Sequence, residues 1–409
     1  MKGINGTEKA MGSTVEHSCF ILAGWLIDGS GRKAVKDCLI EIRGEKIFSA
    51  SPAAPGIKLP PAYEDFSGCT VIPGLTDSHT HLTISGCLDP QLRDTQLTDG
   101  YESAGPRIRK HINDYLAHGV VAVRDGGDFH AHVLKYKNEF QAGREKNLAI
   151  YAAGNGLHKK DRYGQLLGMY LEPGRDPGNA VLEDFRPGTD HVKVVNSGVN
   201  SLKAFGRETK PQFTRKELKS IVDAAGSIGL DVMVHANGKI PVRLAVEAGC
   251  RTIEHGFFMG DDNLKRMADA GAAWCPTACT MKAYRDITSP YDPQYHVAEK
   301  NMLHQLEQIE KAVKYGVTII MGTDAACPGV YHGGAVIDEF KLLMEAGMSV
   351  EQAVKSAASD AAKIIRNPSG NGTIAKGMPA TFAVLNGTPS GFPDSLKNIK
   401  CLWIKGRKV

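Results

Sequence analysis

Eight short apolar segments recur between residues 70 and 324, and helical sequence lies between most of them. The eight segments are TVIPGLTD (70–77), GVVAVRD (119–125), NLAIYAAG (147–154), DHVKVVNSG (190–198), LDVMVHA (230–236), RTIEHG (251–256), AAWCPT (272–277) and VTIIMGTD (317–324). Strands of a parallel sheet are buried on both faces and therefore read as continuous apolar runs. Strand–helix alternation predicts an α/β fold, and eight units favour a (β/α)8 TIM-like barrel over residues 73–369. From pattern alone, a doubly wound sheet is the alternative.

The two ends of the chain differ in sequence pattern from the central region of alternating strands and helices. Residues 18–72 and the last forty residues read as short β segments separated by Gly, Asp and Pro, as in DCLIEIRGEKIFSA and KCLWIKGRKV. Neither end carries enough apolar sequence to fold alone. We therefore expect residues 1–72 and 370–409 to combine into one small β-sandwich beside the barrel domain of 73–369.

The charge composition of the chain argues against certain classes of binding partner. The 409 residues carry a net charge of +4 and 23% charged side chains, which is too weak a bias for binding nucleic acid or an anionic membrane. No signal peptide or membrane-spanning run is visible, and nine cysteines without a C-x-x-C pair suggest reduced thiols. We expect a cytoplasmic protein that binds neither nucleic acid nor a membrane. The sequence is compatible with a homo-oligomer.

Polar residues follow several of the predicted strands, where barrel enzymes hold their catalytic groups. His79 and His81 are two positions apart on an extended segment, so both side chains point the same way and can bind one ion. The pair His130 and His132 instead opens a predicted helix, where such residues diverge, and we expect it to face solvent. The other polar residues at strand ends are Lys193, His235, His255 and Asp324. Together they predict a metal site.

Lys193 permits two interpretations. A buried ammonium is costly unless it is paired, and it repels a cation. A neutral lysine amine can take up CO2 and become an anionic carbamate that bridges two metals. The alternative is a lysine paired with a carboxylate at the mouth of the barrel, and the residues alone do not decide between them.

The motifs PGLTDSHTHL, VKVVNSG, VMVHANG, TIEHG and IIMGTDA resemble the amidohydrolase superfamily, in its binuclear branch with a carboxylated lysine. The stretch PQFTRKELKSIVDAA is similar to the imidazolonepropionase-related and Xaa-Pro or Xaa-Arg/Lys dipeptidase group. The resemblance implies two divalent metal ions, with zinc expected and a carbamate on Lys193 between them. It assigns His79, His81 and Asp324 to one ion, and His235 and His255 to the other. Two positions depart from the pattern: Asn237 replaces a histidine and Thr381 an acidic residue.

The implied reaction is hydrolysis of a C–N amide bond, in a dipeptide or N-acyl amino acid, by a hydroxide formed between the two metals. Asp324 is the expected general base and then acid. Asp77 either orients the two nearby histidine rings or only caps its strand. Cyclic amidohydrolase activity on a lactam or imidazolone ring is the main alternative. A deaminase is less favoured, because Gly238 stands where that chemistry uses Glu.

Residues that contact the substrate are predicted from loops. His158 resembles the loop histidine of the dipeptidase group and is a catalytic candidate. Arg162 and Tyr163 follow in the same loop, GNGLHKKDRYG, and basic residues there are suited to holding a carboxylate. His332 follows Asp324 in CPGVYHGG and is a further substrate-binding candidate. The loop SGVNSLKAFGRETKPQ (197–212) is long enough to cover the site.

Overall fold

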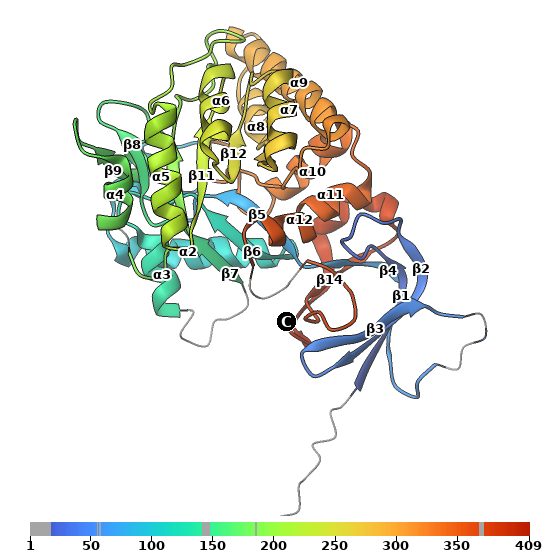
Figure 1. The fold of residues 1–409 in the computed structure, drawn as a ribbon. Helices are drawn as coiled ribbons and strands as arrows, with labels where there is room; N and C mark the ends of the chain where they lie inside the picture. Colours follow the sequence, from blue (N-terminus) through green and yellow to red (C-terminus); the bar gives the residue numbers. More distant parts are fainter. Residues whose placement is uncertain (1–17, 55, 57–58, 141–147, 185, 368–371) are drawn as a thin grey trace, which may run out of the picture.

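The computed structural model describes residues 18–54, 56, 59–140, 148–184, 186–367 and 372–409. Figure 1 shows a group of central strands with helices on their outer side, and a second sheet made by the two ends of the chain. The fold therefore belongs to the α/β class. Within the described residues, no helix combines the length and the apolar character needed to cross a bilayer.

Nine strands make up the central part. They are β5 (Leu75–Thr80), β6 (Val120–Asp125), β7 (Ala149–Ala152), β8 (Gly156–Lys159), β9 (Gly168–Leu171), β10 (His191–Val195), β11 (Asp231–Ala236), β12 (Thr252–His255) and β13 (Ala273–Cys275). They form two parallel sheets, in the orders β5-β6-β7 and β13-β12-β11-β10-β8-β9. Because all pairings are parallel, the carboxyl ends of these strands meet at one side.

Backbone hydrogen bonds connect the two parallel sheets. On one side, the Asp190 amide, one residue before β10, donates to the Ala152 carbonyl of β7. On the other side, residues 317–324 lie between β13 and β5. The Trp274 amide donates to the Thr318 carbonyl, and the Ser78 amide donates to the Met321 carbonyl. The connected strands therefore leave no free edge next to β5.

The predicted eighth strand, residues 317–324, needs correction. The structure records only an isolated parallel bridge between Trp274 and Ile319 in place of a full strand. Two amides of the segment donate outside the strand ladder, since the Met321 amide donates to the Ser356 carbonyl and the Thr323 amide to Asp77 Oδ1. The predicted first strand, 70–77, is also divided. Its first part belongs to β4 and its second part to β5, with Gly74 between them.

Twelve helices surround or follow these strands in the described residues. They are α1 (Pro90–Thr98), α2 (Tyr101–Leu116), α3 (His132–Phe140), α4 (Pro177–Glu183), α5 (Arg215–Ser227), α6 (Lys239–Ala248), α7 (Asp261–Ala270), α8 (Cys279–Ile287), α9 (Pro293–Tyr315), α10 (Ala335–Glu345), α11 (Val350–Ser356) and α12 (Ser359–Ile364). Helix α5 shows why they form where they do. Thr214 and Glu217 make a reciprocal capping box at its start, and Leu218, Ile221 and Ala225 are buried on one face.

Seven strands from the two ends of the chain form one sheet, in the order β16-β15-β14-β4-β1-β2-β3. They are β1 (Ser18–Leu26), β2 (Val35–Arg43), β3 (Lys46–Pro52), β4 (Glu64–Pro73), β14 (Phe382–Asn386), β15 (Ile399–Ile404) and β16 (Arg407–Lys408). Alternate residues have different surroundings, as the pleat requires. Phe382 and Val384 belong to the sheet's own core, whereas Ala383 and Leu385 pack into the large core of the central part.

Candidate metal centre

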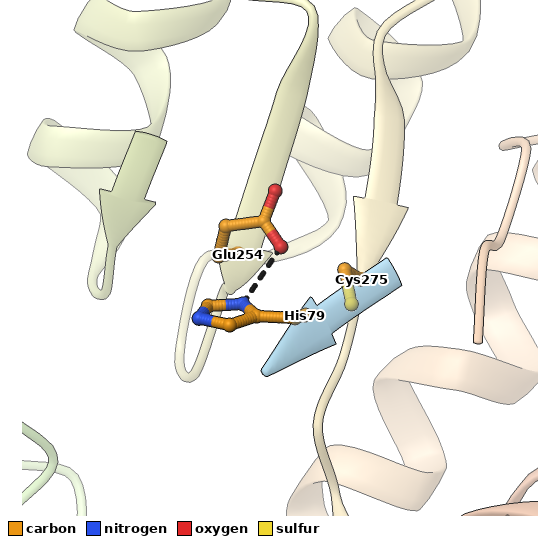
Figure 2. Close-up of side chains that lie close together, drawn as sticks. All are labelled: His79, Glu254 and Cys275. Atoms are coloured by element: carbon orange, nitrogen blue, oxygen red, sulfur yellow. Dashed lines mark hydrogen bonds and ion pairs between the residues drawn. The ribbon is translucent and has the colours of Figure 1, made fainter. Parts of the chain in front are cut away.

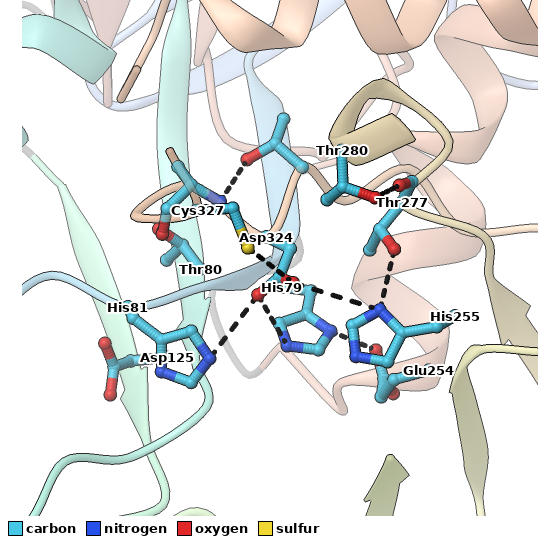
Figure 3. Close-up of polar contacts among 12 residues, drawn as sticks. His79, Thr80, His81, Asp125, Glu254, His255, Thr277, Thr280, Asp324 and Cys327 are labelled. Carbon is cyan, nitrogen blue, oxygen red and sulfur yellow. Dashed lines mark hydrogen bonds and ion pairs between the residues drawn. The ribbon is translucent and has the colours of Figure 1, made fainter. Parts of the chain in front are cut away.

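All six predicted ligands line one cavity of about 520 Å³ at the carboxyl ends of the parallel strands. His79 comes from β5, Lys193 from β10, His235 from β11 and His255 from the end of β12, while His81 follows β5 and Asp324 ends the 317–324 segment. Residues separated by almost 250 positions therefore meet because parallel strands end on the same side. Figure 3 shows His79, His81, His255 and Asp324 pointing toward one another.

The contacts between these groups are short. The Asp324 Oδ1 atom lies 3.4 Å from His79 Nε2 and 3.5 Å from His81 Nε2 (Figure 3). The Lys193 ammonium nitrogen lies 3.3 Å from His79 Nε2. His79, His81 and Asp324 offer three ligand atoms that all lie within 4.8 Å of one another, which suits a metal ion.

Each of the four histidines has one ring nitrogen bonded to a neighbour. The four contacts are His79 Nδ1 to Glu254 Oε2 at 2.8 Å, His81 Nδ1 to the Gly127 carbonyl at 3.0 Å, His235 Nε2 to the Gly198 carbonyl at 3.1 Å, and His255 Nδ1 to Thr277 Oγ1 at 2.8 Å. The second nitrogen of each ring is then left for another partner. Histidines that bind metals are held in this way, because the outer contact fixes the orientation of the ring.

Two of these side chains depend on an unusual backbone. His255 has φ of +69° and Asp324 has φ of +56°. This left-handed region is disfavoured for residues with a Cβ atom, and such strain concentrates at functional sites. In β12 the regular alternation places Glu254 inward, so His255 would point outward. The left-handed turn brings the His255 side chain back toward the cavity.

Glu254 and Arg124 support the centre through the His79 ring. Neither residue is among those predicted from the sequence. Arg124 Nη2 donates to Glu254 Oε1 at 2.8 Å, while the other carboxylate oxygen holds His79. Both side chains are almost completely buried. The sequence did contain a signal, since Arg124 follows four apolar residues in β6 and Glu254 directly precedes His255 in β12. A buried pair of opposite charges is the arrangement that makes such residues tolerable.

Figure 2 shows a second possible ligand group, formed by His79, Glu254 and Cys275. This group is less suited to a metal ion. Both Glu254 oxygens are already engaged, and the Arg124 guanidinium beside them repels a further cation. Burial raises the pKa of the Cys275 thiol well above its usual value, so the thiolate needed for metal binding is disfavoured.

Burial also sets the protonation of the ligand residues. It lowers the pKa of His81 to about 4 and that of His235 to about 3, and it lowers the pKa values of His79 and His255 well below the usual value. All four imidazoles are therefore neutral near pH 7, which is the form that binds metals. Burial lowers the pKa of Lys193 and raises that of Asp324 to about 6. The donor set fits divalent cations.

Asp77 lies beneath the site and links two segments. Its Oδ1 atom accepts from the His79 amide at 3.1 Å, and its Oδ2 atom accepts from Thr323 Oγ1 at 2.6 Å and from the Tyr115 hydroxyl at 2.8 Å. Among the described residues these contacts join β5 to the 317–324 segment, and none of them reaches a histidine ring. Of the two roles considered for Asp77, the structure favours the one that fixes the strand.

Among the loop residues predicted to contact substrate, only Tyr163 lines the cavity. Its ring centroid is 5.3 Å from that of His235. His158 lies in β8 with 1% of its surface exposed and is not part of the cavity wall. Its Nδ1 atom faces the Lys159 carbonyl, and its Nε2 atom is buried without a partner in the described residues. His158 makes no contact with the cavity that would support the predicted catalytic role.

Arg162 and His332 also lie outside the cavity wall. Arg162 Nη2 donates to the Lys210 carbonyl at 3.0 Å, on the outer side of the loop. His332 Nε2 donates to the His81 carbonyl at 3.1 Å and the His332 ring stacks on His111, so His332 is buried behind His81. Through these contacts His332 holds the chain in place just after β5. Neither Arg162 nor His332 reaches the space where a substrate would bind.

Comparisons with known proteins show the family to which the chain belongs. A model of the amidohydrolase family matches residues 70–409. Ochratoxinase of Aspergillus niger is 26% identical over 379 residues, which covers 83% of this chain and 75% of that protein. Imidazolonepropionase of Porphyromonas gingivalis is 22% identical over 389 residues, covering 88% of this chain and 84% of that protein.

Solved structures show the same fold. A crystal structure of a Xaa-Pro dipeptidase with methionine bound in its active site has a TM-score of 0.80 and 25% identity, and the likeness covers 96% of this chain and 100% of that one. The structure of A. niger ochratoxinase has a TM-score of 0.78 over 96% and 95% of the two chains. The predicted superfamily is confirmed. The chain belongs to the amidohydrolase family and is a hydrolase that acts on carbon–nitrogen bonds.

Proposed function

We propose that this protein is a metal-dependent hydrolase that cleaves the amide bond of an N-acyl amino acid or a dipeptide. One observation carries the proposal: four neutral histidines, each held through its outer ring nitrogen, share a cavity with Asp324 and Lys193. The similarity to an ochratoxinase and to a Xaa-Pro dipeptidase supports a small amide substrate. A cavity of about 520 Å³ is the size used for small molecules.

Two divalent cations, zinc by preference, are the proposed cofactor. His79, His81 and Asp324 would hold one ion and His235 and His255 the other, with Lys193 between them as a carbamate. Lys193 is 2% exposed, and the polar contact of its nitrogen among the described residues is with His79 Nε2 at 3.3 Å rather than with a carboxylate. Burial lowers its pKa and so favours the neutral amine that takes up CO2. When bound, the two cations supply an activated water and polarise the substrate carbonyl.

Asp324 is the proposed proton carrier. Its Oδ1 atom faces the two histidines of the first segment, and its Oδ2 atom accepts from the Cys327 thiol at 3.2 Å. Burial raises the pKa of Asp324 to about 6 when the site holds no cation, which makes this carboxylate a stronger base than an exposed aspartate. It would take a proton from the attacking water and deliver it to the leaving nitrogen.

The architecture proposed around this site is a (β/α)8 barrel over residues 73–369. The hydrogen bonds that connect β7 to β10, and β13 to β5 through residues 317–324, support a closed arrangement. Residues 18–72 and 370–409 would form one accessory β domain, supported by the common sheet of β1–β4 and β14–β16.

Metal content and product analysis test the function. We expect the purified protein to hold close to two equivalents of divalent metal per chain, measured by elemental analysis, and to release free amino acid from N-acyl amino acids. A chelator should abolish this release, and added zinc should restore it. Release of ammonia from an aminated ring with one metal per chain would instead favour a deaminase. Opening of an imidazolone-type ring would favour the activity of the Porphyromonas relative.

A further inference from the structure

The wall of the cavity combines four kinds of surface. Its inner end holds the six proposed ligands. Apolar side chains line much of the rest, namely Leu166, Leu167, Val195, Val199, Leu202, Phe257 and Met281. Two cationic side chains, Lys203 and Arg207, belong to the wall on the loop of residues 197–212, and uncharged polar side chains make up the remainder. A substrate that matches this wall has an apolar group and a negative charge.

Among the described residues, no acidic side chain pairs with Lys203 or Arg207 and so competes with a bound anion. Both are exposed, and the structure gives neither side chain a hydrogen bond or ion pair among the described residues. Nearby cations differ in this respect, since Lys159 is paired with Glu217 at 2.7 Å. Glu208, the acid next to Arg207, is engaged elsewhere because its Oε2 atom accepts from the Lys239 amide at 2.7 Å. The two charges are therefore available to a ligand.

The loop that carries these cations is fixed at several points. The Gly198 amide donates to Thr209 Oγ1 at 2.8 Å, which ties one end of the loop to the other. Asn301 of α9 donates to the Ser201 carbonyl at 3.0 Å, and the Phe205 ring packs edge-on against Phe258. The Gly198 carbonyl also holds the His235 ring. The same loop thus orients a proposed metal ligand and presents the two cations.

Negative charge is scarce in the cavity wall. Among the described residues that form it, Asp324 is the single carboxylate, and it faces His79, His81 and the Cys327 thiol. A free α-ammonium group of a substrate would find no spare anion, since Asp324 and the proposed Lys193 carbamate would already hold the metals, and Lys203, Arg207 and those metals would repel it. An uncharged acyl group meets no such cost.

From this juxtaposition we propose that Lys203 and Arg207 bind the carboxylate of the substrate, and that the enzyme prefers N-acyl amino acids with an apolar side chain to dipeptides with a free amino group. The proposal rests on the proposed amidase function and narrows its substrate. It makes the 197–212 loop the part of the chain that selects for charge.

Three matched compounds test the selection. N-acetyl-L-phenylalanine is the reference, glycyl-L-phenylalanine adds only an ammonium group to it, and N-acetyl-L-phenylalaninamide removes the carboxylate charge. We expect kcat/KM for the reference to exceed that of each other compound by about tenfold at low salt, as two exposed charge contacts allow. K203M or R207M should lower the ratio of reference to amide about threefold, and the double variant should remove it. K210M is the control, because this cation lies in the same loop outside the cavity wall.

A binding measurement separates this proposal from the proposed function. The dissociation constants of 3-phenylpropionate and 3-phenylpropionamide, measured by calorimetry, require no turnover. Tighter binding of the carboxylate in wild type and K210M, lost in the double variant, supports the proposal even if no amide is cleaved. A preference for the carboxylate that survives the double variant would come from another group and would overturn it. So would equal cleavage of the N-acetyl and glycyl compounds.

Discussion

Side chains at the inner end of the cavity and side chains at its mouth are held by different parts of the chain. At the inner end, His79 and His235 stand on buried strands, and each has its outer ring nitrogen bonded to a neighbour. At the mouth, Lys203 and Arg207 stand on a loop, are exposed and have no partner among the described residues. The inner end is therefore prepared for a reaction before substrate arrives, whereas the mouth acquires its contacts only when an anion binds.

Lys193 gives the largest expected effect, because it lies where both proposed ions meet. We expect K193A to lose the paired metals and to lower kcat by about a thousandfold or more, which is the scale of removing an electrostatic group from a reaction centre. Metal content and kcat, measured on the same preparation, check this. Partial recovery with a short carboxylic acid would follow if a carboxylate can replace the carbamate.

The matched control for Lys193 is K203M at the mouth, which should keep its full metal content. Wild-type activity in K193A without any added acid would contradict a bridging role. Loss of metal in K203M would show that the inner end depends on the mouth, and the distinction between the two regions would then fail.

Glu254 gives an intermediate effect, because it acts on the metal only through the His79 ring. We expect E254Q to weaken metal affinity by about 10- to 100-fold, the range for residues that orient a metal ligand. It should also lower stability by about 3 kcal/mol, since Arg124 is left in a buried site without its anion. Competitive metal titration and thermal unfolding measure the two effects. E172Q, which changes an exposed ion pair with Lys160, should alter neither of them.

The same distinction explains what the sequence could predict. Polar residues that follow apolar strands identified all six groups at the inner end, because parallel strands bring their carboxyl ends together. The pleat then places His79 on one side of its strand. Family and fold class followed from the same motifs. These properties depend on local pattern and on a regular rule of assembly, and both can be seen in a single sequence.

Other features depend on contacts that no local pattern records. The left-handed backbone at His255 reverses the direction that the alternation in TIEHG predicts. The Met321 and Thr323 amides of the predicted eighth strand donate to the Ser356 carbonyl and to the Asp77 side chain, and the pattern of residues 317–324 does not reveal either contact. Loop residues were the least predictable, since Arg162 and His332 turn to backbone carbonyls outside the cavity wall. Lys203 went unnoticed because one lysine in a polar loop has no distinguishing signal.

Arg162 gives the smallest expected effect and tests the boundary of the mouth. Its guanidinium donates to the Lys210 carbonyl and does not line the cavity, although it follows His158 by only four residues. We therefore expect R162M to change kcat/KM for N-acetyl-L-phenylalanine by no more than about twofold, as for an ordinary surface substitution. R207M, an equal loss of charge on the cavity wall, should lower it further. A larger effect of R162M than of R207M would contradict this expectation. The loop after β8 would then have to move inward when substrate binds, and the cavity mouth would include that loop as well as residues 197–212.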